Sequence, residues 1–254
     1  MTFLLIKRNY LLLLILLLAL FLRVWQLDKV PVSLFGDELD FGYHAYSILY
    51  TGRDYTGHLL PLHLQSLAEY KTSLYAYVSV PTIAIFGITP LGVRLPGVLF
   101  GVSGIWALYL LVVQITAKKE IGLLSALLLA LTPWHIQYSR SGYEQTLMLF
   151  LYIMGIYLFI KGLREYRLLV WSTVCLALTP WAYSTAKLFL PMTIIGILSI
   201  WNHSLLKIPK KPLLIAVVVF ALLAGTFTLN TVFGGGAERF GGISIFNSSI
   251  LENK

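Results

Sequence analysis

Long apolar stretches, separated by short polar turns, run along most of the chain. A transmembrane helix needs about 20 mostly apolar residues, with a range of roughly 17 to 25. Stretches near this length lie at residues 10–27, 91–117, 121–138, 146–162, 168–183, 188–201 and 213–232. The pattern predicts an all-α, polytopic membrane protein with seven spans, followed by a polar tail or outer loop at 233–254.

One further apolar segment, residues 71–87, contains Thr, two Ser and a central Pro81. Whether it crosses the membrane decides on which side all later loops lie. If it stays at the outer surface, the basic clusters of the later inner loops share a side with Lys7 and Arg8. The excess of Lys and Arg in cytoplasmic loops favours this arrangement. We therefore interpret 71–87 as an interfacial or re-entrant helix of an outer loop, 28–90, with a cytoplasmic N-terminus in the plasma (inner) membrane.

Composition indicates that lipid is the solvent, because 58% of the residues are hydrophobic and only 12% are charged. Water-soluble domains carry about 25% charged residues. The formal net charge is +8. The topology above puts ten basic and two acidic residues inside, and nine of each outside. The net charge therefore follows from membrane topology, and no nucleic-acid partner is needed to explain it.

The segment SLFGDELDFGYHAYSILY, from Ser33, places three carboxylates where the first span ends. Apolar positions three or four apart predict a short amphipathic helix over 38–50. Asp37 stands where it can cap this helix, since an N-cap carboxylate accepts a hydrogen bond from a free backbone amide. From this segment alone, a cap with two solvated acids, Glu38 and Asp40, and a functional site are both open interpretations.

Other ionisable or hydroxyl side chains stand at the outer ends of later segments: Glu69, Lys71, His135, Arg140, Glu144, Tyr183 and Lys187. For any one of them, a long side chain that reaches to the membrane surface is the simpler explanation. As a set, they predict a shared outer pocket, because ionisable groups that face a bundle interior are usually functional. A carboxylate can deprotonate an acceptor hydroxyl, and Lys or Arg can bind a departing phosphate. At an outer interface, the natural phosphate donor is a lipid phosphate.

Carboxylates at Asp37 and Glu144 could also bind Mg²⁺ or Mn²⁺, which prefer oxygen ligands. No zinc-type spacing of His or Cys occurs, and we expect no required cofactor. Two other functions stay open. A transporter or lipid flippase predicts charges near mid-membrane and paired broken helices, whereas the charges here gather at one face. A non-catalytic membrane subunit is the other alternative.

Four stretches in this order resemble the first half of bacterial GT-C glycosyltransferases: LRVWQLDKVPVSLFGDELDFGYHAYSIL, EYKTSLYAY, VRLPGVLFG and TPWHIQYSRSGYEQ. The resemblance is to the protein O-mannosyltransferase-like and aminoarabinose-transferase-like families, which use polyprenyl-phosphate sugars. It implies a module of seven transmembrane helices with two juxtamembrane helices in the first outer loop. Segments 38–50 and 71–87 correspond to these two helices.

By this resemblance, Asp37 is the catalytic base that activates the acceptor, and Glu38 completes the acidic pair of the family. Glu69 and Lys71 resemble the pair that flanks the lipid phosphate. Tyr70 separates the two here, whereas the pair is adjacent in the aminoarabinose-transferase branch.

The later outer turns supply the remaining site residues. Glu144 resembles the second acidic position of the family, and Arg140 and Lys187 are expected to contact the donor phosphate. His135 and Tyr183 are expected to line the same pocket. The implied reaction moves a mannose-type hexose from a polyprenyl-phosphate donor to a hydroxyl of a protein or lipid acceptor. Family members continue for several more helices, so the chain is expected to be a truncated product, a fragment or a minimal module.

Overall fold

The structure is a computed structural model that describes residues 2–66 and 70–233. Glu69 and the predicted tail beyond Phe233 lie outside the described residues. Apart from one short two-stranded hairpin, the described elements are helices. The prediction of a helical protein is confirmed, and the hairpin is the exception to its all-α class.

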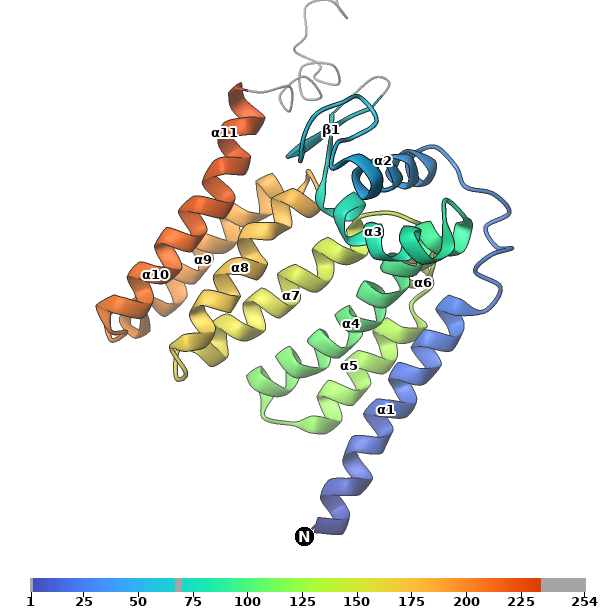
Figure 1. Ribbon diagram of the computed structural model, residues 1–254. Coiled ribbons are helices and arrows are strands. Elements are labelled where there is room, and N and C mark those ends of the chain that lie inside the picture. The colour runs from blue at the N-terminus through green and yellow to red at the C-terminus, as the bar shows by residue number, and fades with distance from the viewer. Residues whose placement is uncertain (1, 67–69, 234–254) are drawn as a thin grey trace, which may run out of the picture.

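Most of the helices run side by side in one bundle (Figure 1). Apart from the short α6 (Pro133–Arg140), which bends away from the end of α5, they are α1 (Thr2–Val24), α4 (Pro90–Thr116), α5 (Lys119–Leu131), α7 (Gln145–Gly162), α8 (Arg167–Ala182), α9 (Ala186–Leu206), α10 (Lys210–Phe220), the π-helical turn η1 (Ala221–Gly225) and α11 (Thr226–Phe233). The elements α10, η1 and α11 follow one another without a break and form one rod, the α10–α11 rod. In Figure 1, α1 lies at one edge of the bundle and α10 at the other.

Four segments of the described chain are long and apolar enough to cross a membrane: Pro90–Thr116, Gln145–Gly162, Ala186–Leu206 and Lys210–Thr231. The pair α5 and α6, bent by 60°, is a fifth if it counts as one span. The bend falls at Thr132, whose backbone is extended because a residue before proline disfavours the helical region. The apolar stretches Tyr10–Val24 and Arg167–Ala182 are shorter. The count of seven spans therefore stays a prediction.

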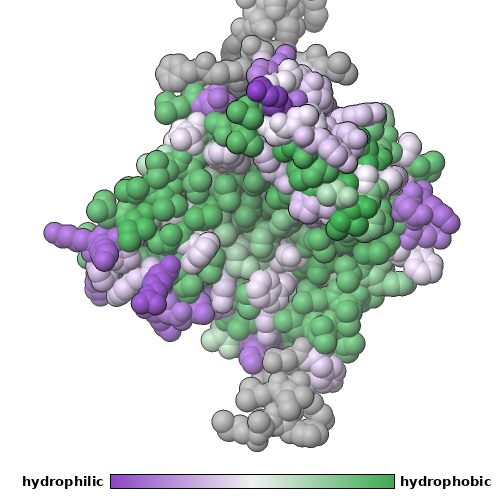
Figure 2. Space-filling model, in the orientation of Figure 1, coloured by the Kyte–Doolittle hydropathy of each residue, from purple (hydrophilic) through white to green (hydrophobic). Residues whose placement is uncertain are grey.

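The surface of the bundle is hydrophobic over its middle, with hydrophilic residues gathered toward its ends (Figure 2). Large apolar side chains on the long helices are exposed, among them Leu13 (56%), Leu188 (69%) and Met192 (68%). Continuous apolar surface of this kind marks contact with a membrane. The protein is therefore a membrane protein, with lipid covering these side chains.

Two helices, α2 (Asp37–Thr51) and α3 (Leu74–Phe86), lie across one end of the bundle (Figure 1). Phe41 of α2 packs edge-on against Tyr75 of α3, with ring centres 5.3 Å apart. Both rings are fully buried and belong to a core cluster that also contains Val93 of α4 and Leu147 of α7. This core fixes the start of α2 against the ends of two long helices.

Two short strands, β1 (His63–Gln65) and β2 (Tyr70–Thr72), lie between α2 and α3 in sequence. They pair antiparallel, with Leu64 opposite Lys71. The helix predicted to start at residue 71 therefore starts only at Leu74. Apolar character alone is compatible with a helix or a strand. Here the backbone of residues 70–72 is paired with an upstream segment, which a local pattern does not reveal.

Candidate functional site

Asp37 is the first residue of α2. The residue before it, Gly36, has a φ of +41°, a conformation that favours glycine. Gly36 occupies the N-cap, and α2 has no side-chain capping bond. The interpretation of Asp37 as a cap is therefore wrong. Its Oδ1 instead accepts a hydrogen bond from Lys71 Nζ at 2.6 Å, and its side chain is 53% exposed.

Lys71 is held between two carboxylates. Its Nζ also donates to Asp40 Oδ2 at 2.9 Å and lies 5.6 Å from the ring centre of Phe41. Burial by itself lowers the pKa of Lys71, but the hydrogen bonds and charges of Asp37 and Asp40 outweigh burial and raise it overall. Lys71 is therefore a cation at neutral pH, and with Asp37 and Asp40 it forms the Lys71 cluster.

Asp40 is a half-buried member of the cluster with two hydrogen-bond donors and not a solvated acid, which corrects the interpretation from sequence. Its side chain is 13% exposed, and its Oδ1 accepts a hydrogen bond from the Tyr55 hydroxyl at 2.8 Å. Burial, followed by the bond to Asp40, raises the pKa of Tyr55 to about 12, so Tyr55 stays a donor at neutral pH. The spacing of Asp37 and Asp40 was the available signal, since residues three apart share a helix face.

His44 lies behind Asp40 and is fully buried. It stacks on Tyr55 with ring centres 4.0 Å apart, and its Nε2 is 3.8 Å from Asp40 Oδ1. Neither ring nitrogen has a hydrogen-bond partner among the described residues. Burial lowers the pKa of His44 against smaller opposing effects of Asp40 and Asp54. The imidazole is therefore neutral at pH 7.

Glu38 points away from Lys71 and forms a buried ion pair with Arg94 of α4. Arg94 donates to both carboxylate oxygens, at 2.8 and 3.1 Å, and the two side chains are 0% and 3% exposed. The amides of Gly142 (2.8 Å) and Phe35 (3.3 Å) donate to the same carboxylate. Arg94 also donates to the carbonyl of Ser33 at 2.9 Å. Glu38 thus has four donors and holds the loop before α2 in place.

Arg140 and His135 of α6 contact α1 and the residues that follow it, and not the Lys71 cluster. Arg140 donates to backbone carbonyls at the end of α1 and just after it, including Leu22 (3.0 Å) and Val30 (2.8 Å). His135 Nδ1 lies 2.8 Å from a guanidinium nitrogen of Arg23, and both of these side chains are fully buried. These contacts join α6 to α1. None of them involves the Lys71 cluster.

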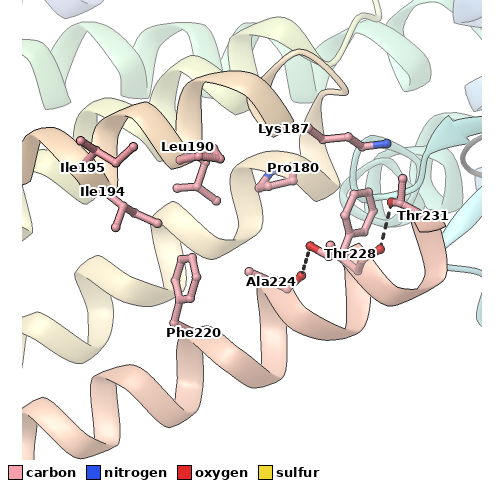
Figure 3. Close-up of a pocket in the computed structure, with 11 residues that line it drawn as sticks. Pro180, Lys187, Leu190, Ile194, Ile195, Phe220, Ala224, Thr228 and Thr231 are labelled. Atoms are coloured by element: carbon pink, nitrogen blue, oxygen red, sulfur yellow. Dashed lines mark hydrogen bonds between the residues drawn. The ribbon is translucent and has the colours of Figure 1, made fainter. Parts of the chain in front are cut away.

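Lys187 stands at one end of a groove of about 450 Å³ between α8, α9 and the α10–α11 rod (Figure 3). The lining is mostly apolar and includes Leu190, Ile194 and Phe220. Lys187 Nζ lies 5.3 Å from the ring centre of Phe227. Sequence reasoning selected Lys187 but gave no sign of the groove, because hydropathy shows where α8, α9 and the α10–α11 rod run along the chain and not how they pack against one another.

The β-hairpin ties the groove to the Lys71 cluster. His63 of β1 hydrogen-bonds Asn230 of α11 at 2.6 Å. On the other strand, the Thr72 hydroxyl donates to the carbonyl of Ala182 at the end of α8, at 2.8 Å. Lys71 is the neighbour of Thr72 on β2. The end of the groove and the Lys71 cluster are therefore attached to one short element.

The remaining candidates are Glu144 and Tyr183. Glu144 directly precedes α7 and is 8% exposed. Tyr183 follows α8, and its backbone amide donates to the carbonyl of Thr179 at 3.0 Å. Among the described residues, no three His, Cys, Asp or Glu side chains come together as a metal-binding group. The arrangement of these residues offers an acid–cation cluster and an apolar groove between helices.

The sequence model of the dolichyl-phosphate-mannose-protein mannosyltransferase family matches residues 71–227. Searches of the curated proteins and of the solved structures give no significant match. The matched range is more than half of the chain and includes Lys71, Glu144 and Lys187, whereas Asp37 and Glu38 precede it. The family is one of membrane glycosyltransferases of the mannosyltransferase type. On this match, the chain belongs to the dolichyl-phosphate-mannose-protein mannosyltransferase family.

Proposed function

We propose that this protein transfers a mannose-type hexose from a polyprenyl-phosphate donor to a hydroxyl of a protein or lipid acceptor. The reaction takes place at the outer face of the plasma (inner) membrane, with Asp37 as general base. The family supports this donor class and, in general, a protein acceptor. The observation that carries the proposal is the position of Asp37, a half-exposed carboxylate on a buried lysine.

The step is an inverting displacement. Asp37 takes the proton of the acceptor hydroxyl as its oxygen attacks C1 of the sugar. The bond between C1 and the phosphate oxygen breaks, and polyprenyl phosphate leaves with the electron pair. Proton transfer by a placed carboxylate contributes typically about 10² to 10⁴ in rate.

Asp37 suits the role of base better than Glu38. One oxygen of Asp37 has no hydrogen-bond partner among the described residues, so it can accept a proton from an incoming hydroxyl. The carboxylate of Glu38 is only 3% exposed, and Arg94 and the Gly142 amide already donate hydrogen bonds to it. We therefore assign Glu38 to positioning: it anchors Arg94 and the loop that leads into Asp37.

Lys71 suits the role of a phosphate partner because it is charged and touches the base. When the donor phosphate approaches, Lys71 can exchange its hydrogen bond to Asp37 for one to the phosphate. Its hydrogen bond to Asp40 stays in place during this exchange. This exchange frees Asp37 to act as base. Cationic groups at the leaving oxygen stabilise the charge that develops there.

The groove supports a lipid donor. A polyprenyl chain is apolar and flexible, and the groove offers apolar walls between membrane helices with Lys187 at its end. The end with Lys187 is the end tied to the hairpin that carries Lys71. A chain in the groove would direct its phosphate toward these lysines. The scheme uses no metal, and we expect transfer to persist in a chelator.

The test is the substitution Asp37→Asn in the purified full chain, reconstituted in liposomes with a radiolabelled polyprenyl-phosphate mannose donor. We expect transfer to fall by at least about 100-fold, since the amide cannot accept the proton. Asp28→Asn is the matched control, because Asp28 is an exposed acid in the same outer loop. Transfer by Asp37→Asn at the level of Asp28→Asn would contradict the assignment.

A further inference from the structure

A second polar pocket lies at the end of the bundle opposite to α2 and the hairpin. It has a volume of about 420 Å³ and is lined by the ends of three helices and the turn between α7 and α8. In Figure 1, the α7–α8 turn and the α9–α10 turn lie together at this end, far from β1. The pocket is therefore separate from the Lys71 cluster and from the groove at Lys187.

Two cations line this pocket, Arg164 and Lys207. Both are exposed, and neither makes an ion pair within the part of the chain that the structure describes. Glu165, the acid next to Arg164 in sequence, is paired with a different cation: its Oε1 lies 3.6 Å from Lys161 Nζ. The two cations thus face the pocket with their charge available to an anion.

The rest of the lining is amphipathic. Trp201 and Tyr166 supply large aromatic surfaces with a polar atom, and Ser204 and Gln114 supply hydrogen-bonding groups. Trp201 packs edge-on against Phe159, with ring centres 5.6 Å apart. Aromatic rings of this type are enriched where a membrane meets water. The site therefore offers cations for a phosphate, polar groups for its substituents and apolar walls below.

The surface around the pocket is lipid-facing. Leu206, the neighbour of Lys207, is 83% exposed, and Ile200, the neighbour of Trp201, is 69% exposed. A ligand held by Arg164 and Lys207 thus has apolar surface beside it on which acyl chains can lie. Basic pockets between membrane helices bind anionic lipid headgroups in this way.

We propose that this pocket binds the headgroup of an anionic phospholipid, with Arg164 and Lys207 on the phosphate. The whole end supports this charge preference. In the described part of the chain, the α4–α5, α7–α8 and α9–α10 turns and the helix ends beside them carry eight basic residues, namely Lys118, Lys119, Lys161, Arg164, Arg167, Lys207, Lys210 and Lys211, against Glu120 and Glu165. The bound lipid would clamp the ends of α4, α7 and α9 together with the α7–α8 turn. The proposal does not depend on the glycosyl-transfer reaction.

The experiment titrates the purified full chain, in a neutral detergent, with dioleoyl phosphatidylglycerol or dioleoyl phosphatidylcholine. Native mass spectrometry reads the lipid that stays bound. Arg164→Gln/Lys207→Gln removes both cations that line the pocket and should weaken phosphatidylglycerol binding by roughly tenfold or more. Lys210→Gln/Lys211→Gln removes the same charge from the same end but outside the pocket, so it should weaken phosphatidylglycerol binding clearly less than the pocket variant does.

Three outcomes, one of them from an added competition with glycerol 3-phosphate, would overturn the proposal. Equal binding of both lipids by the wild-type protein would overturn it, whatever the fate of the variants. If soluble glycerol 3-phosphate displaced phosphatidylglycerol at equal concentration, the pocket would bind a free phosphate and not a lipid. Equal phosphatidylglycerol binding by the two double variants would place the preference outside the pocket.

Discussion

The ammonium of Lys71 lies 2.6 Å from the carboxylate of Asp37, although 34 positions separate them in sequence. The contact exists because β2 brings Lys71 beneath the first turn of α2, where Asp40 holds its other side at 2.9 Å. Asp37 is the exposed partner and Asp40 the half-buried one. A ligand can therefore reach Asp37 without disturbing the anchor at Asp40.

The first prediction concerns Lys71. Lys71→Met should lower kcat/KM for sugar transfer by roughly 100-fold or more, because it removes a cation from the departing phosphate. Lys71→Arg should retain part of the activity, since it keeps the charge. The measurement is transfer from a labelled donor at several donor concentrations.

The control for Lys71 is Lys29→Met, which removes an exposed lysine from the same outer loop. It should keep wild-type kinetics. If Lys71→Met and Lys29→Met gave the same kcat/KM, Lys71 would have no part in the reaction.

The second prediction concerns the buried pair of Arg94 and Glu38. Arg94→Met leaves the Glu38 carboxylate buried without its cation, and breaking a buried pair in this way costs about 3–5 kcal/mol of folding stability. The double variant Arg94→Met/Glu38→Leu should recover part of this loss, because no charge stays buried. Thermal unfolding in detergent measures both.

Arg167→Met is the control for this pair, because Arg167 is an exposed arginine at the start of α8. It should unfold close to wild type. A melting temperature of Arg94→Met equal to that of Arg167→Met would show that the pair does not hold the loop before α2.

The third prediction is a pH dependence of stability that arises from His44. Burial lowers its pKa below the ordinary value of 6.5, with Asp40, Asp54 and Lys71 as the neighbouring charges. Below about pH 6.5 the unfolded chain therefore binds more protons than the folded one, and the free energy of unfolding falls as pH drops. Well above that pH the imidazole is neutral in both states, and its titration adds nothing to the pH dependence of stability.

His44→Phe keeps the stacking on Tyr55 and removes the titration. Its melting temperature should fall less than that of wild type between pH 7.5 and pH 5.5. Some pH dependence should persist, because burial also lowers the pKa of His63. The exposed His203 provides the comparison: His203→Phe should follow wild type. A pH response of His44→Phe identical to that of His203→Phe would rule out His44 as the source.

Hydropathy predicted the helical segments of the bundle because an apolar run of sufficient length is helical in lipid whatever its neighbours are. The break before Pro133 was also predictable, since the residue before a proline leaves the helical region. The start of α3 was not, because the backbone of Tyr70–Thr72 is paired with a strand outside any local window.

The candidate site was likewise predictable from the sequence only in part. Asp37 and Lys71 were predicted as site residues and do touch. The role of Asp40 and the ion pair of Glu38 with Arg94 were missed, because each depends on a partner 31 or 56 positions away. Residue type indicates that a carboxylate needs a partner, but only the fold of the outer loop decides which partner it finds.

The last prediction tests the groove at Lys187 as the site of the donor chain. Ile194→Trp places a larger ring on the groove wall. If the polyprenyl chain lies there, KM for a long-chain polyprenyl-phosphate mannose should rise by roughly tenfold or more, the equivalent of about 1.4 kcal/mol of lost binding. A donor with a two-isoprene chain should be affected less, because less of it reaches the wall. Ile215→Trp, on the exposed side of α10 and outside the groove, should leave both values unchanged. An equal rise in KM for both donors with Ile194→Trp would instead indicate a general loss of structure, and no rise for either would place the chain elsewhere on the bundle.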